Sequence, residues 1–245
     1  MNGLSLASFD RALSRFTFLY LVIAALELAS HFFRETAPLF HYVTKPLIVL
    51  SLLVFYLIHA RIREGLLRYV IPLALFFSLM GDVFLMFLGE RFFLLGLSSF
   101  LLAHVCYILA FGHMHNRSGE RPLLRRKPWL IFFFVFYLAM LMLLIYPGLG
   151  PMRAPVVVYS IVILTMSLMA LNRWKRVPQD SFSWVFFGAL LFMLSDSLIA
   201  ITRFGFPIPF SQTWIMLTYM AAQYLIVAGM LRQIRTPRPQ VARMN

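Results

Sequence analysis

The chain is a series of long, uninterrupted apolar runs separated by short polar or basic connections. A bilayer core of about 30 Å needs roughly 20 helical residues per crossing, and eight runs have that length. They cover approximately residues 16–34, 42–60, 69–88, 92–113, 128–147, 153–172, 184–203 and 213–231. The alternation of apolar and polar residues that a transmembrane β-barrel requires is absent. We therefore predict an all-α integral membrane bundle of about eight transmembrane helices, forming a single transmembrane domain over residues 1–245.

The connections between these runs hold most of the basic residues. Of the 22 Lys and Arg residues, 17 fall on the side that holds both termini and five on the other. Cytoplasmic loops are enriched in Lys and Arg, so both termini are expected in the cytoplasm. A bacterial inner membrane is favoured, with an internal eukaryotic membrane as the alternative. The first run contains Glu27 and lacks a clear cleavage site, so we expect it to be retained and not removed as a signal peptide.

Composition supports the membrane assignment. The chain is 61% hydrophobic and 13% charged, whereas soluble domains carry roughly 45–50% apolar and about 25% charged residues. The net charge of +13 could suggest nucleic acid, but no basic face with interleaved aromatic residues occurs in a soluble segment, so no nucleic-acid partner is expected. The single cysteine, Cys106, allows no intramolecular disulfide and no zinc-type spacing.

A weak internal repeat relates the two halves of the chain. Residues 75–82 and 189–196 both read as an apolar run, a small residue and Asp, and residues 107–112 resemble 224–229. The third and fourth helices would then correspond to the seventh and eighth, running in the same direction. This pattern indicates two four-helix halves related by a parallel repeat, as in some membrane proteins. Chance similarity among apolar helices is the alternative.

Three acidic residues lie inside the apolar runs: Glu27, Asp82 and Asp196. A carboxylate inside a bilayer is costly, so such residues usually face an interior cavity and serve a function. At 1.5 Å per residue they lie roughly 16, 20 and 18 Å from the inner ends of their helices. His104 and Gln223, on helices of opposite direction, reach nearly the same depth. These five groups predict one polar site beyond the midplane, although carboxyls that only lock helices together are the structural alternative.

Several neighbouring residues could support this site. His104 and Tyr107 share a helical face by their i, i+3 spacing, as Tyr219 and Gln223 do by i, i+4. No HExxH pattern or paired histidine supports a metal, and no cofactor is expected. Lys45 and Arg203 are placed at the outer ends of their helices, where they could hold a lipid phosphate or extend their charged groups toward water.

A set of blocks spread from the second to the eighth helix resembles the YhhN-like lysoplasmalogenase family. The blocks are Lys45-Pro46, Ser78-Leu79-Met80-Gly81-Asp82, Phe92 to Gly96, His104-Val105-Cys106-Tyr107, Phe192-Met193-Leu194-Ser195-Asp196 and Tyr219-Met220-Ala221-Ala222-Gln223. The resemblance implies eight transmembrane helices and hydrolysis of the vinyl ether bond of lysoplasmalogens to a fatty aldehyde and a glycerophospho-base. It also implies that Asp82 and Asp196 occupy the two catalytic carboxylate positions.

Vinyl ether hydrolysis begins with protonation of the carbon–carbon double bond, which gives an oxocarbenium ion that water captures. A general acid must stay protonated near neutral pH, which a low-dielectric site and a second carboxylate both promote. An ionised partner would stabilise the cation, as paired carboxylates do around glycosidic oxocarbenium ions. We therefore hypothesise that Asp82 and Asp196 form this pair, either of them being the acid. His104, Tyr107, Ser195, Tyr219 and Gln223 would support the pair, with Glu27 as a further candidate.

The sequence thus predicts a membrane hydrolase acting on a lysophospholipid substrate in the lipid bilayer. A lipid or proton-coupled transporter is the leading alternative, because transporters also place acids at the midplane of repeated halves. A non-catalytic scaffold or lipid sensor is a third interpretation. The headgroup, chain length and oligomeric state are left open by the sequence.

Overall fold

The computed structural model describes residues 6–33, 36, 38–60, 66–113 and 121–235. Within these residues the regular structure is entirely helical. The α-helices are α1 (Leu6–Ser30), α2 (Pro38–His59), α3 (Leu67–Leu85), α4 (Glu90–Gly112), α5 (Leu123–Arg126), α6 (Leu130–Ile145), α7 (Arg153–Leu171), α8 (Gln179–Phe204) and α9 (Ser211–Arg235), with two 3₁₀ turns, η1 (Tyr146–Gly148) and η2 (Gly150–Met152), between α6 and α7. All except α5 belong to segments long and apolar enough to cross a membrane, which confirms the predicted eight-span, all-α fold.

Two spans extend beyond the expected bounds, and these bounds are corrected here. The first helix begins at Leu6 instead of near residue 16, because Phe9 and Leu13 are buried in the core at helical spacing. The seventh span, α8, begins at Gln179 instead of near residue 184, directly after Pro178. Six basic residues that contributed to the predicted topology, together with the end of the first predicted span, lie outside the described residues: Arg34, Arg61, Arg63, Arg117, Arg238 and Arg243.

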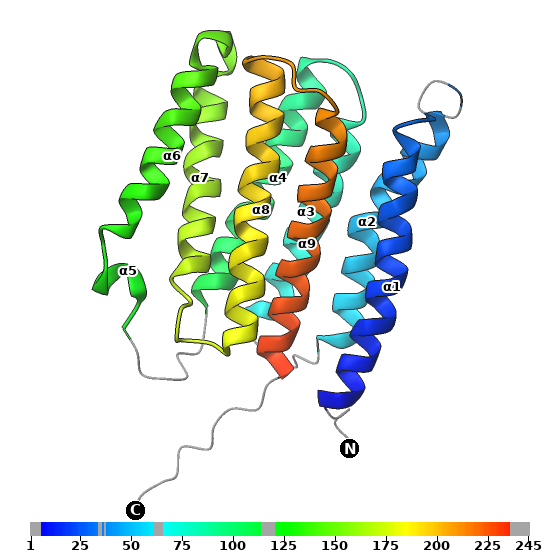
Figure 1. The fold of residues 1–245 in the computed structure, drawn as a ribbon, viewed down its shortest axis with the longest axis vertical. Coiled ribbons are helices and arrows are strands. Elements are labelled where there is room, and N and C mark those ends of the chain that lie inside the picture. Colours follow the sequence, from blue (N-terminus) through cyan, green and yellow to red (C-terminus); the bar gives the residue numbers. More distant parts are fainter. Residues whose placement is uncertain (1–5, 34–35, 37, 61–65, 114–120, 236–245) are drawn as a thin grey trace, which may run out of the picture.

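The spans form a bundle in which most helices adjacent in sequence are adjacent in space, except that α4 packs against α7 and not against α6 (Figure 1). The α1–α2 hairpin occupies one flank and α6 the other, with α8 and α9 in front of α3 and α4. The first helix starts and the last helix ends at the same end of the bundle, as an even number of crossings requires. Many large apolar side chains, such as Phe18 and Phe132, point outward, which suits a surface covered by lipid tails.

Two tight hairpins, α3–α4 and α8–α9, bring the central helices together. The α3–α4 turn contains Gly89 at φ 115°, a backbone conformation that residues other than glycine rarely adopt. In the other hairpin, a Cβ on Gly188 would lie 2.9 Å from the carbonyl oxygen of Ala222. Small residues at such crossings let helix backbones approach closely in membranes. The two hairpins therefore pack tightly around the interior polar residues.

A buried arginine links three helices at the end of the bundle where the termini lie. Arg173, in the α7–α8 connection, is completely buried and donates to the Ser181 hydroxyl at 2.8 Å and to the Gln233 side-chain oxygen at 2.6 Å. Its guanidinium also lies over the Phe111 ring. Burial lowers the pKa of Arg173 to about 9, so the group stays charged at neutral pH. In the sequence this residue was accounted for by topology alone, whereas the structure gives it a role in tying α4, α8 and α9 together.

Candidate active site

Asp196 on α8 is the centre of the first polar group in the interior. Its Oδ2 accepts a hydrogen bond from the hydroxyl of Tyr159 on α7 and lies 3.8 Å from Nε2 of His104 on α4. The imidazole is completely buried, and the edges of the Tyr159 and His104 rings meet with centroids 5.4 Å apart. Three helices therefore converge on one carboxyl group that remains about 11% exposed.

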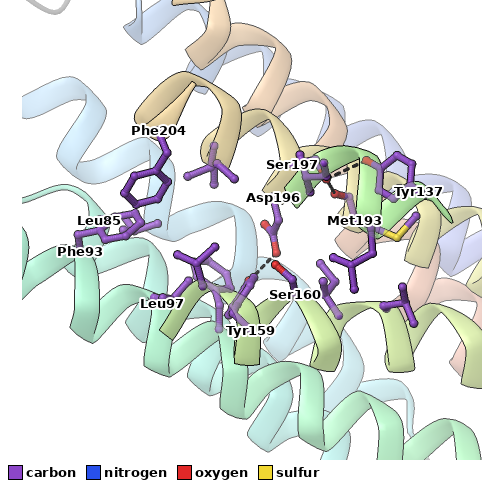
Figure 2. A pocket seen from close by; sticks show the side chains of 18 residues that line it. Leu85, Phe93, Leu97, Tyr137, Tyr159, Ser160, Met193, Asp196, Ser197 and Phe204 are labelled. Carbon is purple, nitrogen blue, oxygen red and sulfur yellow. Dashed lines mark hydrogen bonds between the residues drawn. The ribbon is translucent and has the colours of Figure 1, made fainter. Parts of the chain in front are cut away.

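That exposed part of Asp196 faces a cavity between α4, α6, α7 and α8. The cavity has a volume of about 50 Å³ and a mostly apolar lining, in which Asp196, Tyr159, Ser160, Ser197 and Tyr137 are polar. Figure 2 shows the Asp196 and Tyr159 side chains pointing toward each other, and Tyr137 bonded to Ser197 nearby. A cavity of this size with several polar groups on its wall has room for water but not for a lipid chain.

Asp82 on α3 is the centre of a second polar group. Its Oδ2 accepts a 2.8 Å hydrogen bond from the hydroxyl of Tyr219 on α9, which in turn accepts one from Gln223 at 3.3 Å. The side-chain oxygen of Gln223 accepts a further bond from Tyr107 on α4 at 2.7 Å. All four side chains are almost completely buried, so the helix-face pairing predicted for Tyr219 and Gln223 is present and connects α3, α4 and α9.

The Phe192 ring contacts both polar groups. The Phe192 ring packs against His104 at 4.7 Å and against Tyr219 at 5.4 Å, and it therefore touches both polar groups. Asp82 does not line the cavity at Asp196, and among the described contacts each carboxyl bonds to its own tyrosine and not to the other. Asp82 and Asp196, hypothesised from the sequence to act as an acid and base pair, are thus each held by a tyrosine, and Phe192 contacts a side chain of each group.

Ser195, although adjacent to Asp196, serves a different contact. Its hydroxyl donates to the carbonyl oxygen of Ile215 on α9 at 3.0 Å. Consecutive residues on a helix point about 100° apart, so Ser195 faces α9 while Asp196 faces α7. This hydrogen bond helps to pack α8 against α9, and it does not involve either carboxyl group.

Lys45 and Arg203 line the same pocket, of about 380 Å³, near the ends of α3, α4, α8 and α9. The hydroxyl- and amide-bearing residues Thr202, Ser211 and Gln212 complete its polar wall. The Arg203 guanidinium lies 3.8 Å from the centroid of the Phe93 ring. This pocket and the cavity at Asp196 share the walls Leu85, Phe93 and Ile199. The two spaces therefore adjoin.

Glu27, a candidate for the same polar site, forms no described hydrogen bond or ion pair with the residues of either polar group. It is completely buried near the end of α1, where Oε2 accepts bonds from Thr44 at 2.5 Å and Ser30 at 3.3 Å. Nitrogens of His31 and His41 lie 3.4 and 3.0 Å from Oε1. Depth along a helix does not fix the direction of a side chain, and Glu27 faces α2.

Sequence reasoning missed Tyr159, His31 and His41. Tyr159 has no matching block in the resemblance, but a tyrosine beside a serine, Ser160, in the middle of an otherwise apolar run was a usable signal. Glu27 and His31 share a helix face at i, i+4 spacing, which was also visible in the sequence. The approach of His41 depends on how α1 packs against α2, and the sequence contains no marker for it.

An eight-span helical bundle with two carboxyl groups in its interior defines a polytopic membrane protein of the kind that handles a substrate or an ion within the bilayer. The model of the YhhN family matches residues 40–230, most of the chain, and the chain belongs to this family. The matched stretch includes every residue of the two polar groups and of the Lys45 pocket, but neither Glu27 nor His31.

Individual relatives carry the name lysoplasmalogenase. The chain is 35% identical over 162 residues to lysoplasmalogenase TMEM86A of Bos taurus, covering 62% of this chain and 61% of the relative. It is 33% identical over 168 residues to lysoplasmalogenase TMEM86B of Homo sapiens (68% and 64%) and 32% identical over 165 residues to a lysoplasmalogenase of Mycobacterium tuberculosis (66% and 60%). The aligned part thus spans less than two thirds of each of these relatives. No solved structure matches the chain significantly.

Proposed function

We propose that this protein hydrolyses the vinyl ether bond of lysoplasmalogens inside the membrane. The observation that carries the proposal is the junction of two spaces: a cavity that reaches the carboxyl of Asp196 and a pocket lined by Lys45 and Arg203. A lysophospholipid has an anionic phosphate a few bonds away from its alkenyl ether. The names of the relatives support this substrate class.

The substrate phosphate binds in the pocket of Lys45 and Arg203, where two cations and several polar side chains meet. Its vinyl ether passes the shared walls Leu85 and Phe93 and reaches Asp196. The cavity at Asp196 is too small for an alkenyl chain, so the chain displaces a wall of the cavity. The span α6 is the least buried of the eight, and an element with few buried contacts opens at low cost.

The reaction consumes one water. Asp196 donates its proton to the alkenyl carbon that is not bonded to oxygen, which converts the adjacent carbon and the ether oxygen into an oxocarbenium ion. Water adds to that carbon and gives a proton back to the carboxylate, forming a hemiacetal. The bond between this carbon and the glycerol oxygen then breaks, the glycerol oxygen takes up a proton, and the hemiacetal hydroxyl loses one. The products are a fatty aldehyde and a glycerophospho-base.

The surrounding side chains hold Asp196 and stabilise the cation. Tyr159 fixes one carboxyl oxygen, and His104 lies within reach of the same oxygen. Asp82, held by Tyr219 on the other side of Phe192, contributes negative charge to the region of the oxocarbenium ion. Tyr107 and Gln223 support Asp82 through Tyr219. General acid–base groups of this kind contribute about 10²–10⁴-fold to a rate.

The test is aldehyde release from a 1-alkenyl lysophospholipid by the purified protein in detergent. We expect turnover by the wild type and a loss of at least about 10²-fold in Asp196→Asn and Asp82→Asn. Asp180→Asn is the matched control, because Asp180 is 78% exposed and pairs only loosely with Arg232 at 3.6 Å. Absence of aldehyde from folded wild type would contradict the proposed reaction. Near-normal turnover by folded Asp196→Asn would contradict the assignment of the acid.

We further propose that both termini lie in the cytoplasm, on the basis of the 17 basic residues that the sequence assigns to the connections and tails on that side. The pocket of Lys45 and Arg203 then opens toward the opposite side. Labelling of single cysteines introduced at Asp180 and at Gln212 in intact cells tests this orientation, after replacement of Cys106 by serine. An impermeant reagent should label position 212 and spare position 180; the reverse pattern would invert the topology.

A further inference from the structure

Glu27, His31 and His41 form a cluster that the proposed reaction does not use. One carboxylate oxygen and one nitrogen from each imidazole lie within 4.8 Å of one another. Glu27 lies in the last turn of α1, His31 directly follows that helix, and His41 comes from the first turn of α2. The cluster therefore joins the two helices of the first hairpin.

The two oxygens of Glu27 have different surroundings. Oε2 accepts hydrogen bonds from Thr44 and Ser30, whereas Oε1 is buried and has no hydrogen bond of ordinary geometry among the described residues. The nitrogens nearest to Oε1 are Nδ1 of His41 at 3.0 Å and Nε2 of His31 at 3.4 Å, and the latter is also buried without a hydrogen bond. A completely buried carboxylate oxygen is costly to leave unsatisfied. Its environment thus points to a missing partner.

The spacing of these atoms suits a metal ion. Zinc binds imidazole nitrogen at about 2.0–2.1 Å and carboxylate oxygen at about 2.0–2.2 Å, so tetrahedral ligand atoms lie about 3.3–3.5 Å apart. The separations of 3.4 and 3.0 Å need only small side-chain adjustments to match. The bonds from Thr44 and Ser30 to Oε2 would orient the ligating carboxylate, as second-shell groups commonly do.

We propose that Glu27, His31 and His41 bind one divalent transition-metal ion of the zinc class, which joins the ends of α1 and α2. Two imidazoles and a carboxylate leave one tetrahedral position open for a water. Nitrogen-rich ligand sets favour such ions over Mg²⁺ and Ca²⁺, which prefer oxygen. Two of the three ligands, Glu27 and His31, precede the stretch matched by the family, whereas His41 lies within it.

The test uses full-length protein without a polyhistidine tag, stripped with a chelator and titrated with Co²⁺. We expect one Co²⁺ per chain with the visible absorption of a tetrahedral ion, displacement by Zn²⁺, and no competition by Mg²⁺. His31→Gln, His41→Gln and Glu27→Gln should each weaken binding by more than about 10-fold, since even second-shell changes cost 10–100-fold. His59→Gln is the matched control, because His59 lies at the opposite end of α2.

Two results would overturn the site: no stoichiometric binding by the wild type, or binding by the His31 and His41 variants equal to that of the control. If Glu27→Gln does not fold, His31→Gln carries the test, since that side chain is partly exposed and ends the helix. The thermal midpoint of the wild type should also rise when Zn²⁺ is added, through preferential binding to the folded state. The same addition should leave the midpoint of His31→Gln unchanged.

Discussion

Replacement of Tyr159 by Phe removes a single hydroxyl from the candidate site. That hydroxyl donates to Oδ2 of Asp196, and the ring itself packs edge-on against His104 at 5.4 Å. Phenylalanine keeps the ring contact and leaves the carboxyl without this donor. The substitution therefore tests whether the position of Asp196, and not the filling of the interior, sets the rate of vinyl ether hydrolysis.

The size of the effect follows from the kind of hydrogen bond that is lost. The Asp196 carboxyl becomes charged as it gives up its proton, and a hydrogen bond to a charged group contributes about 1.5–3 kcal/mol. Each 1.36 kcal/mol of barrier corresponds to a tenfold change in rate, which gives roughly 10–150-fold. Folding should change less. A typical net hydrogen bond of about 1 kcal/mol lowers the melting temperature of a protein of this size by roughly 2–4 °C.

The assay is the initial rate of aldehyde release, with thermal unfolding measured on the same samples. Tyr56→Phe is the control: Tyr56 is completely buried and donates to the carbonyl oxygen of Leu67 at 3.1 Å, at the other end of the bundle. Both variants should lose similar stability, but only Tyr159→Phe should lose activity. Equal rates in the two variants, or an unchanged rate in Tyr159→Phe, would refute the role of Tyr159 in holding the acid.

Four other substitutions address the rest of the molecule. Leu141→Trp fills the cavity at Asp196 from α6 and should reduce turnover by about tenfold or more. Leu144→Trp, on the lipid-facing side of the same helix, is the control and should not reduce turnover. Equal rates in the two variants would contradict access of the lipid chain beside α6. Lys45→Gln and Arg203→Gln should each raise KM several-fold, since a hydrogen bond to a charged group is worth about 1.5–3 kcal/mol and exposure to water reduces this value. An unchanged KM in both variants would contradict the binding of the substrate phosphate in this pocket. Arg173→Met removes the hydrogen bonds that Ser181 and Gln233 accept and should destabilise the protein by about 1–3 kcal/mol, measured as a lowered thermal midpoint. An unchanged midpoint would argue against its role in tying the helices.

The fold could be predicted well because the property that determines it, the length of each apolar run, can be read directly along the sequence. Twenty apolar residues in a row have few structural options in a bilayer, so run length alone gives the number of spans. The ends of the helices were harder to predict from the sequence. Arg11 and Arg15 precede the first apolar run and suggested a later start for the first helix, yet Phe9 and Leu13 beside them pack into the core and keep that segment helical. The sequence shows polarity, whereas the end of a helix depends on packing.

The site was predictable in part for a similar reason. Asp82, Asp196, His104 and Gln223 were identifiable because a polar group in an apolar run is costly wherever it points. Which groups touch depends on the rotation and crossing of helices, and that information is spread over many weak contacts. Depth alone placed Glu27 with the two aspartates, although it faces α2. Conversely, Tyr159 was missed, because its helix, α7, has no recognisable motif, although its hydroxyl bonds to Asp196 in the structure.

The two polar groups owe their positions mainly to α9, the most buried span. From this helix Tyr219 reaches Asp82, and the carbonyl oxygen of Ile215 accepts the bond from Ser195 that fixes the register of α8 beside Asp196. The opposite wall, α6, is the least buried span and borders the cavity that Asp196 faces. A site that must hold a carboxyl rigidly and still admit a lipid chain from the bilayer needs this asymmetry. A uniformly tight bundle would exclude the chain, and a uniformly loose one would leave costly carboxyls without their tyrosine partners.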